Sequence, residues 1–187
     1  MISPKTWKEL KEKQVQFDRL IVQKSPTELK WVSYFNAKRL KLALLVEVGE
    51  FANEIKSFKA WQKKQEIDWQ KAKEELIDCL GYFLGLVGIY QVDMFPSLSV
   101  KYERKDLPFN KLLLDFFIET NNLYIKENEE FYNLENIEIK DKDKKNTYYE
   151  WLKTFNRICE KLQIDEPALL NIYSEKNKIN LERVNAK

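Results

Sequence analysis

The stretch LALLVEVGEF, residues Leu42–Phe51, places two acidic side chains inside a strongly hydrophobic segment. Glu47 and Glu50 are three positions apart, so both carboxylates leave the same side of a helix. A second stretch, ELIDCLGYFLGLV, begins at Glu75 and repeats this spacing with Asp78. Core-forming segments rarely carry carboxylates unless a partner offsets the cost of desolvation. The two stretches therefore predict neighbouring apolar helices that share a polar site.

The four carboxylates would repel one another if antiparallel packing brought them to the same level of a helical bundle. A divalent cation relieves such repulsion, and proteins bind Mg²⁺ through a few carboxylates together with substrate phosphates. We therefore predict an Mg²⁺ site for phosphate chemistry, formed by Glu47, Glu50, Glu75 and Asp78. The alternative is that these acids only line the solvated edge of two helices in a non-enzymatic interaction module.

The composition favours helices and excludes several kinds of catalysis. The 187 residues include only 4 glycines and 5 prolines, which is typical of an all-α fold. Histidine is absent, which excludes His-dependent acid–base catalysis and His-ligated zinc. Cys79 lies on an apolar helix stripe, so we expect a reduced, buried thiol. Lys and Arg total 32 against 30 Asp and Glu, a balance that gives no reason to expect nucleic-acid binding.

The chain is predicted to be one domain over residues 1–187, an antiparallel helical bundle. We expect helices at about Pro4–Gln23, Ala37–Trp61, Ile67–Gln91, Phe109–Ile125, Thr147–Leu162 and Pro167–Val184. Asp165 is the expected N-cap of the last helix. The charged region 126–146 is predicted to be an exposed connector. No segment has the character of a secretory signal or a membrane span, so we expect a cytoplasmic protein without a membrane partner.

Five motifs carry a family resemblance. They are QVQFD at Gln14–Asp18, LLVEVGEFANEIKSFKAW at Leu44–Trp61, EELIDCLGYFLGL at Glu74–Leu86, YERKDL at Tyr102–Leu107 and IYSEKNKINLERV at Ile172–Val184. Their order resembles the all-α nucleotide pyrophosphatases, which include the MazG-type enzymes, and most of all the dimeric dUTPases. The tail resembles the KNxxNxxR phosphate-binding helix of that group. Two positions differ from the family pattern: Gly81 stands where a histidine is common, and Val184 where a glutamine is common.

The resemblance implies Mg²⁺-dependent hydrolysis of dUTP to dUMP and pyrophosphate, with cleavage of dUDP left open. It implies that Glu47 accepts the proton of the attacking water, with Glu50 as the alternative base. Three cations would hold the phosphates: Lys59, Lys176 and Arg183. Asn180 would bind a phosphate or the sugar hydroxyl.

For the base, Gln14 offers a donor and an acceptor that match the edge of uracil, and Trp61 could cover the base or the deoxyribose. The resemblance also implies a homodimer, with which apolar residues such as Phe51, Ile55, Phe83 and Ile89 are compatible. A MazG-type pyrophosphatase with another nucleotide preference is the nearest alternative to a dUTPase.

Overall fold

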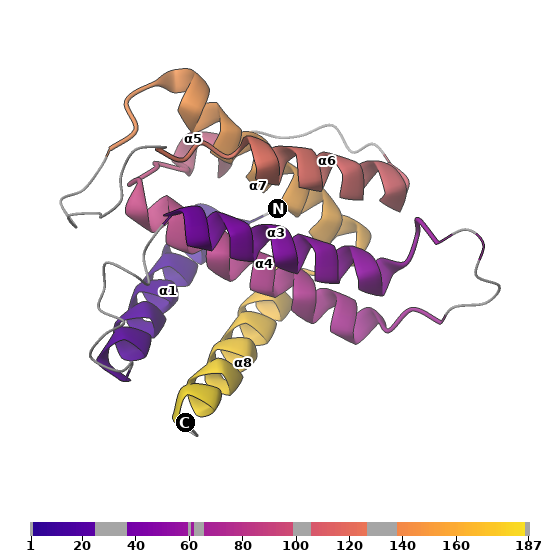
Figure 1. Cartoon of the computed structure of the whole chain (residues 1–187), viewed down its shortest axis with the longest axis horizontal. Coiled ribbons are helices and arrows are strands. Elements are labelled where there is room, and N and C mark those ends of the chain that lie inside the picture. The colour runs from indigo at the N-terminus through magenta and orange to yellow at the C-terminus, as the bar shows by residue number, and fades with distance from the viewer. Residues whose placement is uncertain are drawn as a thin grey trace.

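The computed structural model describes residues 2–24, 37–59, 61, 66–98, 106–126 and 138–185, and every regular element in these ranges is a helix. The helices are α1 (Pro4–Lys24), α3 (Ala37–Ile55), α4 (Trp69–Ile89), α5 (Phe95–Leu98), α6 (Phe109–Asn122), α7 (Lys142–Lys161) and α8 (Glu166–Asn185), as Figure 1 shows. The predicted all-α fold class is confirmed. Among these described helices, none has the length and apolar character needed to cross a membrane.

The antiparallel hairpin of α3 and α4 lies at the centre of the molecule (Figure 1) and is its most extensive helix pairing. Leu44, Val48 and Phe51 recur at helical spacing on α3 and are fully buried. Leu76 and Leu80 form the corresponding buried stripe of α4. Burial of each such side chain contributes about 1.5–3 kcal/mol, so the same apolar stretches that flank the acids also hold the two helices together.

The α3 helix ends at Ile55, whereas the sequence predicted that it would continue to Trp61. The next residue, Lys56, has a φ of 57°, the left-handed conformation in which many helices terminate. The backbone N–H of Lys59 then donates to the carbonyl of Lys56 at 2.9 Å and closes a turn. The chain therefore leaves the helical path before the end of the FKxW motif.

Aspartate caps set the positions at which α4 and α7 begin. The Asp68 carboxylate accepts a hydrogen bond from the Lys71 N–H at 3.0 Å, and Asp141 accepts one at 2.9 Å from the N–H two residues further on. Because of this second cap, α7 begins inside the predicted connector 126–146, which is shorter at its C-terminal end than expected. Residues 127–137 of that connector lie outside the described residues.

The α6 and α7 helices form a layer over the hairpin, joined to it by aromatic packing. The rings of Phe83 and Trp151 are stacked at 3.9 Å between centroids. The indole N–H of Trp151 donates to the Thr120 hydroxyl at 2.9 Å, so the one polar atom of this large buried side chain is satisfied.

Four apolar residues that the sequence analysis considered compatible with a dimer interface instead pack within the single chain. Phe51, Ile55 and Phe83 are all buried within the single chain, and Ile89 is partly buried against the same core. Phe51, Ile55 and Phe83 stabilise the hairpin and its covering layer, so these three side chains are not available to contact a second copy.

The α1 and α8 helices are joined near their N-terminal ends. The Asp165 carboxylate accepts from the Ala168 N–H at 2.9 Å, which confirms the predicted N-cap. Glu166 accepts hydrogen bonds from the hydroxyl groups of Ser3 at 3.1 Å and Thr6 at 3.0 Å. Both helices also pack on α4 and extend on the same side of the hairpin (Figure 1). Side chains of α1, α8 and the hairpin consequently meet around one cavity.

Candidate active site

Three carboxylates converge where α3 faces α4. One oxygen each from Glu47 on α3 and from Glu75 and Asp78 on α4 lies within 4.8 Å of the other two. All three residues are partly buried. Glu50, the fourth predicted ligand, is exposed and does not belong to this group, although its charge acts on Glu47 and Glu75. The hairpin thus brings most of the predicted acidic site together.

The acidic group carries an excess of negative charge in a partly desolvated place. Burial raises the pKa of Glu47 to about 7, and the charges of the three other acids add to the rise. Burial also raises the pKa of Glu75 and of Asp78, while the ammonium of Lys176 opposes both shifts. Oxygen donors that repel one another in this way fit a hard divalent cation, so the donor chemistry of the group suits the metal predicted from the sequence.

The α8 helix presents its predicted phosphate-binding face to these acids. The Lys176 Nζ lies 2.5 Å from the Asp78 Oδ2. Asn180 and Arg183 follow on the same face and line the same cavity, and Arg183 Nη1 donates to Asn180 Oδ1 at 3.3 Å. Two cations and an amide beside a carboxylate group suit a phosphate chain bound next to a metal ion.

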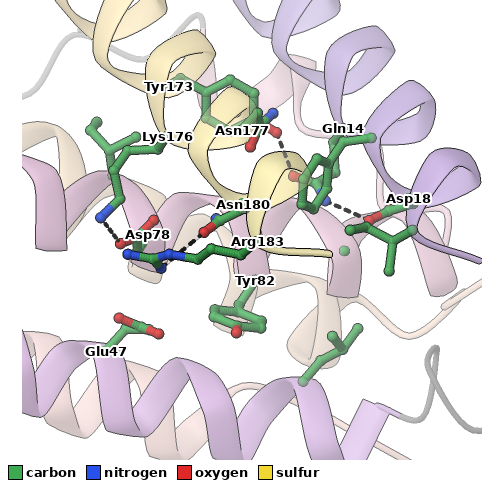
Figure 2. Close-up of a pocket in the computed structure, with 16 residues that line it drawn as sticks. Gln14, Asp18, Glu47, Asp78, Tyr82, Tyr173, Lys176, Asn177, Asn180 and Arg183 are labelled. Atoms are coloured by element: carbon green, nitrogen blue, oxygen red, sulfur yellow. Dashed lines mark hydrogen bonds and ion pairs between the residues drawn. The ribbon is translucent and has the colours of Figure 1, made fainter. Parts of the chain in front are cut away.

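A cavity of about 360 Å³ extends from the acids towards α1, a size within the range of roughly 300–1,000 Å³ typical of small-molecule pockets. Its wall comes from α1, α3, α4 and α8 and includes Gln14, Phe17, Asp18, Leu40, Ile77, Tyr82, Tyr173 and Asn177. Figure 2 shows Glu47 and Asp78 at one end and Gln14 and Asp18 at the other. The cavity therefore has an acidic end and an amide-bearing end.

At the amide-bearing end of the cavity, the Gln14 amide forms hydrogen bonds through both its nitrogen and its oxygen. Its Nε2 donates to the Asp18 Oδ1 at 2.7 Å, and its Oε1 accepts a hydrogen bond from the Tyr173 hydroxyl (Figure 2). A Cβ atom at Gly81 would lie 3.7 Å from this Oε1, so the α4 backbone passes beside the amide. The buried amide is thus part of a wall built by three helices.

An acidic group fitted for a cation, a cationic helix face and a buried amide therefore surround one cavity. A family model described as dUTPase matches residues 6–187. The chain belongs to the all-α dimeric dUTPase family. No curated protein and no solved structure gives a match. The enzyme is a dUTP diphosphatase, a nucleotide pyrophosphohydrolase that converts dUTP into dUMP and pyrophosphate. This finding selects the dUTPase among the three interpretations that the sequence left open.

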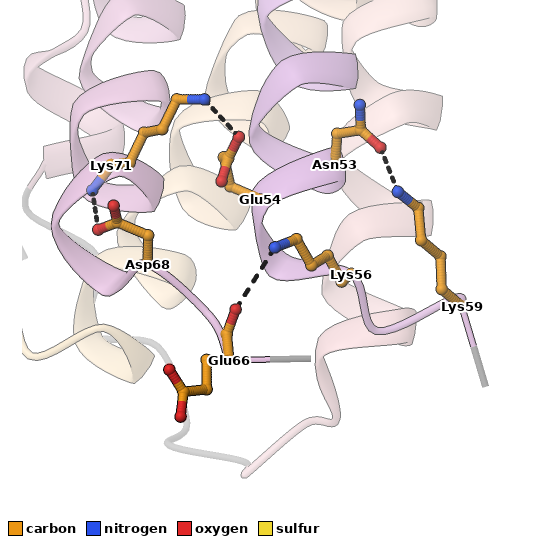
Figure 3. A network of polar contacts seen from close by, with 7 residues as sticks. All are labelled: Asn53, Glu54, Lys56, Lys59, Glu66, Asp68 and Lys71. Atoms are coloured by element: carbon orange, nitrogen blue, oxygen red, sulfur yellow. Dashed lines mark hydrogen bonds and ion pairs between the residues drawn. The ribbon is translucent and has the colours of Figure 1, made fainter. Parts of the chain in front are cut away.

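Two residues predicted to bind the substrate of this dUTPase do not line the cavity. Trp61 is 73% exposed, and the Lys59 Nζ donates to Asn53 Oδ1 at 2.8 Å. Figure 3 shows Lys59 among polar contacts at the connected ends of α3 and α4, where Lys71 and Glu54 form an ion pair of 2.7 Å. The early end of α3 explains the difference, because Lys59 no longer continues the helical face that carries the acids.

Two tyrosines of the dUTPase cavity were not predicted from the sequence. Tyr173 lies one turn before Lys176 on the predicted phosphate-binding face of α8, so helical spacing could have identified it. Tyr82 lies one turn after Asp78 and lines the cavity; burial, and then the neighbouring acids, raise its pKa. The contact of Tyr173 with Gln14 joins positions separated by 159 in the sequence, which no local pattern could indicate.

Proposed function

We propose that the enzyme uses Mg²⁺ bound by Glu47, Glu75 and Asp78, with Glu50 adding a further carboxylate at the exposed edge. The observation that carries the proposal is the set of three carboxylate oxygens within 4.8 Å of one another. Mg²⁺ takes oxygen ligands and leaves positions for water and substrate phosphates. Cys79 lies nearby, but burial raises the pKa of its thiol well above the usual value, so it does not supply a thiolate for a softer metal.

The phosphates are proposed to lie between this metal site and α8. When bound, the divalent cation supplies charge neutralisation at the phosphoryl oxygens and makes a nearby water more acidic. Lys176 and Arg183 bind the phosphate oxygens, Arg183 through the fork of its guanidinium group, and Asn180 binds a phosphate or the sugar hydroxyl. Positioning and charge neutralisation are the main requirements of phosphoryl transfer.

Glu47 is proposed to accept the proton of the attacking water. It lines the cavity beside Asp78 and faces α8, so its carboxylate lies next to the proposed phosphate position. A raised pKa also suits a base that works near neutral pH. Glu50 is the alternative base, but it is exposed and does not line the cavity.

Gln14 is proposed to recognise the base. Its hydrogen bonds to Asp18 and Tyr173 leave one N–H donor and one acceptor lone pair on the amide. Such a pair matches the N3–H and O4 atoms of uracil. Lys59 and Trp61 are still predicted to bind the substrate, although their side chains lie outside the cavity that a single chain forms.

The enzyme is further proposed to be a cytoplasmic homodimer, without a nucleic-acid or membrane partner. Leu42 and Val46 lie one turn apart on α3 and are 64% and 51% exposed, and Leu114 and Ile118 lie one turn apart on α6 and are 57% and 45% exposed. The two helices pack against each other, so they offer apolar side chains on neighbouring elements. Such surfaces are typical of protein interfaces, and a free nucleotide as substrate favours the cytoplasm.

The decisive experiment measures pyrophosphate release from dUTP and from the other nucleoside triphosphates, with Mg²⁺ and with EDTA. We expect Mg²⁺-dependent release from dUTP that is lost in Glu47→Gln. Glu54→Gln is the matched control, because Glu54 lies on the same helix but pairs with Lys71. Full activity in EDTA, or in Glu47→Gln, would contradict the proposed metal site.

A further inference from the structure

A buried chain of three side chains occupies the amide end of the cavity, and we call it the amide clamp: Asp18, Gln14 and Tyr173. Their exposed fractions are 7%, 7% and 1%. Asp18 lies one turn after Gln14 on α1, whereas Tyr173 comes from α8. Figure 2 shows the amide between its two partners at the edge of the cavity. The clamp thus joins the helix that carries the amide to the helix that carries the proposed phosphate ligands.

We propose that Asp18 and Tyr173 are positioning residues that fix the orientation of the Gln14 amide and thereby set the preference for uracil over cytosine. The proposal rests on the proposed role of Gln14 in base recognition. It adds the residues that determine in which orientation the amide nitrogen and oxygen of Gln14 face the base. Neither partner needs to touch the nucleotide for this role.

The orientation matters because uracil and cytosine differ by the exchange of donor and acceptor. Uracil presents N3–H as a donor and O4 as an acceptor, whereas cytosine presents N3 as an acceptor and its 4-amino group as a donor. A glutamine amide that turns by 180° about its last bond exchanges its own donor and acceptor. An amide free to turn would therefore accept either base, and a fixed amide accepts one.

The charge of Asp18 makes one orientation of the Gln14 amide more favourable than the other. An ionised carboxylate only accepts hydrogen bonds, so it keeps Nε2 beside it and repels Oε1. A protonated Asp18 can donate to Oε1, and the Tyr173 hydroxyl can accept from Nε2, so both orientations are then satisfied. Burial raises the pKa of Asp18 to about 7, and the hydrogen bond from Gln14 opposes the rise.

Other charged and titratable groups share the cavity wall with Asp18. They are Tyr173, Lys176 and Arg183 from α8, Asp78 and Tyr82 from α4, and Glu47 from α3. Their protonation changes the hydrolysis of every nucleotide alike, because all substrates place the same triphosphate beside them. The ratio of the kcat/KM values for two substrates cancels these shared effects and therefore reports on the amide clamp.

The test compares kcat/KM for dUTP and for dCTP at about pH 6 and about pH 8 in the wild-type enzyme. We expect the dUTP:dCTP ratio to be about tenfold higher at the alkaline pH, the equivalent of one hydrogen bond to a charged group. The dUTP:dTTP ratio is the internal control and should stay constant, because thymine has the same N3–H and O4 edge as uracil.

Three variants make the result specific. Asp18→Asn should give a low dUTP:dCTP ratio at both pH values, because its amide can pair with either end of Gln14. Tyr173→Phe should lower the ratio by a smaller factor, and it tests the clamp if Asp18→Asn does not fold. A ratio independent of pH in the wild type, or a wild-type ratio in Asp18→Asn, would overturn the proposal. If Gln14→Ala keeps the wild-type ratio, the role of Gln14 itself is wrong; if only Gln14→Ala changes it, the amide clamp alone is wrong.

Discussion

Lys176 and Asp78 join α8 to α4 through an ion pair in which Nζ lies 2.5 Å from Oδ2. Asp78 is one of the three converging carboxylates, and Lys176 is on the face proposed to bind phosphates. The ammonium group therefore pairs with one of the carboxylates that are proposed to bind the metal ion. A cation and a phosphate chain that bind together would separate this pair, since each takes one of its partners.

Replacement of Lys176 should accordingly strengthen the binding of Mg²⁺ and weaken the binding of dUTP. In Lys176→Met we expect tighter binding of Mg²⁺ without nucleotide at alkaline pH, because Asp78 no longer has a competing cation. The KM for dUTP should rise by about tenfold to a hundredfold, the value of one charge-assisted hydrogen bond. Calorimetry of Mg²⁺ binding and steady-state kinetics measure the two effects.

A second lysine of α8 serves as the control for this variant. Lys178→Met alters an exposed residue of the same helix and makes the same change of net charge. It should keep KM within about threefold of the wild-type value. A similar rise of KM in both variants would point to a general effect of net charge and against a specific role of Lys176.

Mg²⁺ should stabilise the folded enzyme through the three carboxylates. At a free concentration about ten times the Kd, binding adds about 1.4 kcal/mol to the free energy of unfolding, which raises the Tm by a few degrees. We expect this rise in the wild type and in Glu54→Gln but not in Asp78→Asn, as measured by differential scanning fluorimetry. An equal rise in Asp78→Asn would place the metal elsewhere.

The position of Glu47 also makes stability depend on pH in the metal-free enzyme. Its pKa is about 7 in the folded chain, above the ordinary value of 4.5 for a glutamate. The folded state therefore holds this proton more tightly, so the free energy of unfolding falls as pH rises between these values and is lowest above them. Glu47→Gln removes this cost and should stabilise the protein at about pH 8 by about 1–2 kcal/mol, after a discount for solvent screening.

Thermal unfolding in EDTA at about pH 4 and about pH 8 tests this expectation. The gain in Tm should be present at the alkaline pH and absent at the acid pH, where Glu47 is protonated in both states. Glu12→Gln, on the exposed part of α1, should change the Tm little at either pH. A destabilised Glu47→Gln at alkaline pH would mean that the carboxylate has a favourable partner when folded.

The helix cores were predictable because their apolar residues recur at helical spacing, as Leu44, Val48 and Phe51 do. The acidic group followed from the same periodicity, which also placed Lys176 and Asn180 on one face of α8. Helix ends were less predictable: the left-handed conformation of Lys56 ended α3 early and left Lys59 and Trp61 away from the cavity. Contacts between distant helices, such as Tyr173 with Gln14, depend on tertiary packing that no sequence window contains.

The exposed apolar side chains of α3 and α6 make the proposed dimer testable. Burial of Leu42 and Leu114 against a second copy would each contribute about 1.5–3 kcal/mol, so a charge at either position should prevent association. In Leu42→Asp and Leu114→Asp we expect a monomer, measured by light scattering after size-exclusion chromatography. Val15→Asp is the matched control, because Val15 is 45% exposed on α1, away from both helices, and it should keep the wild-type mass. If Val15→Asp alone yields a monomer, the interface lies on α1; if the wild type is itself a monomer, the homodimer proposal is wrong.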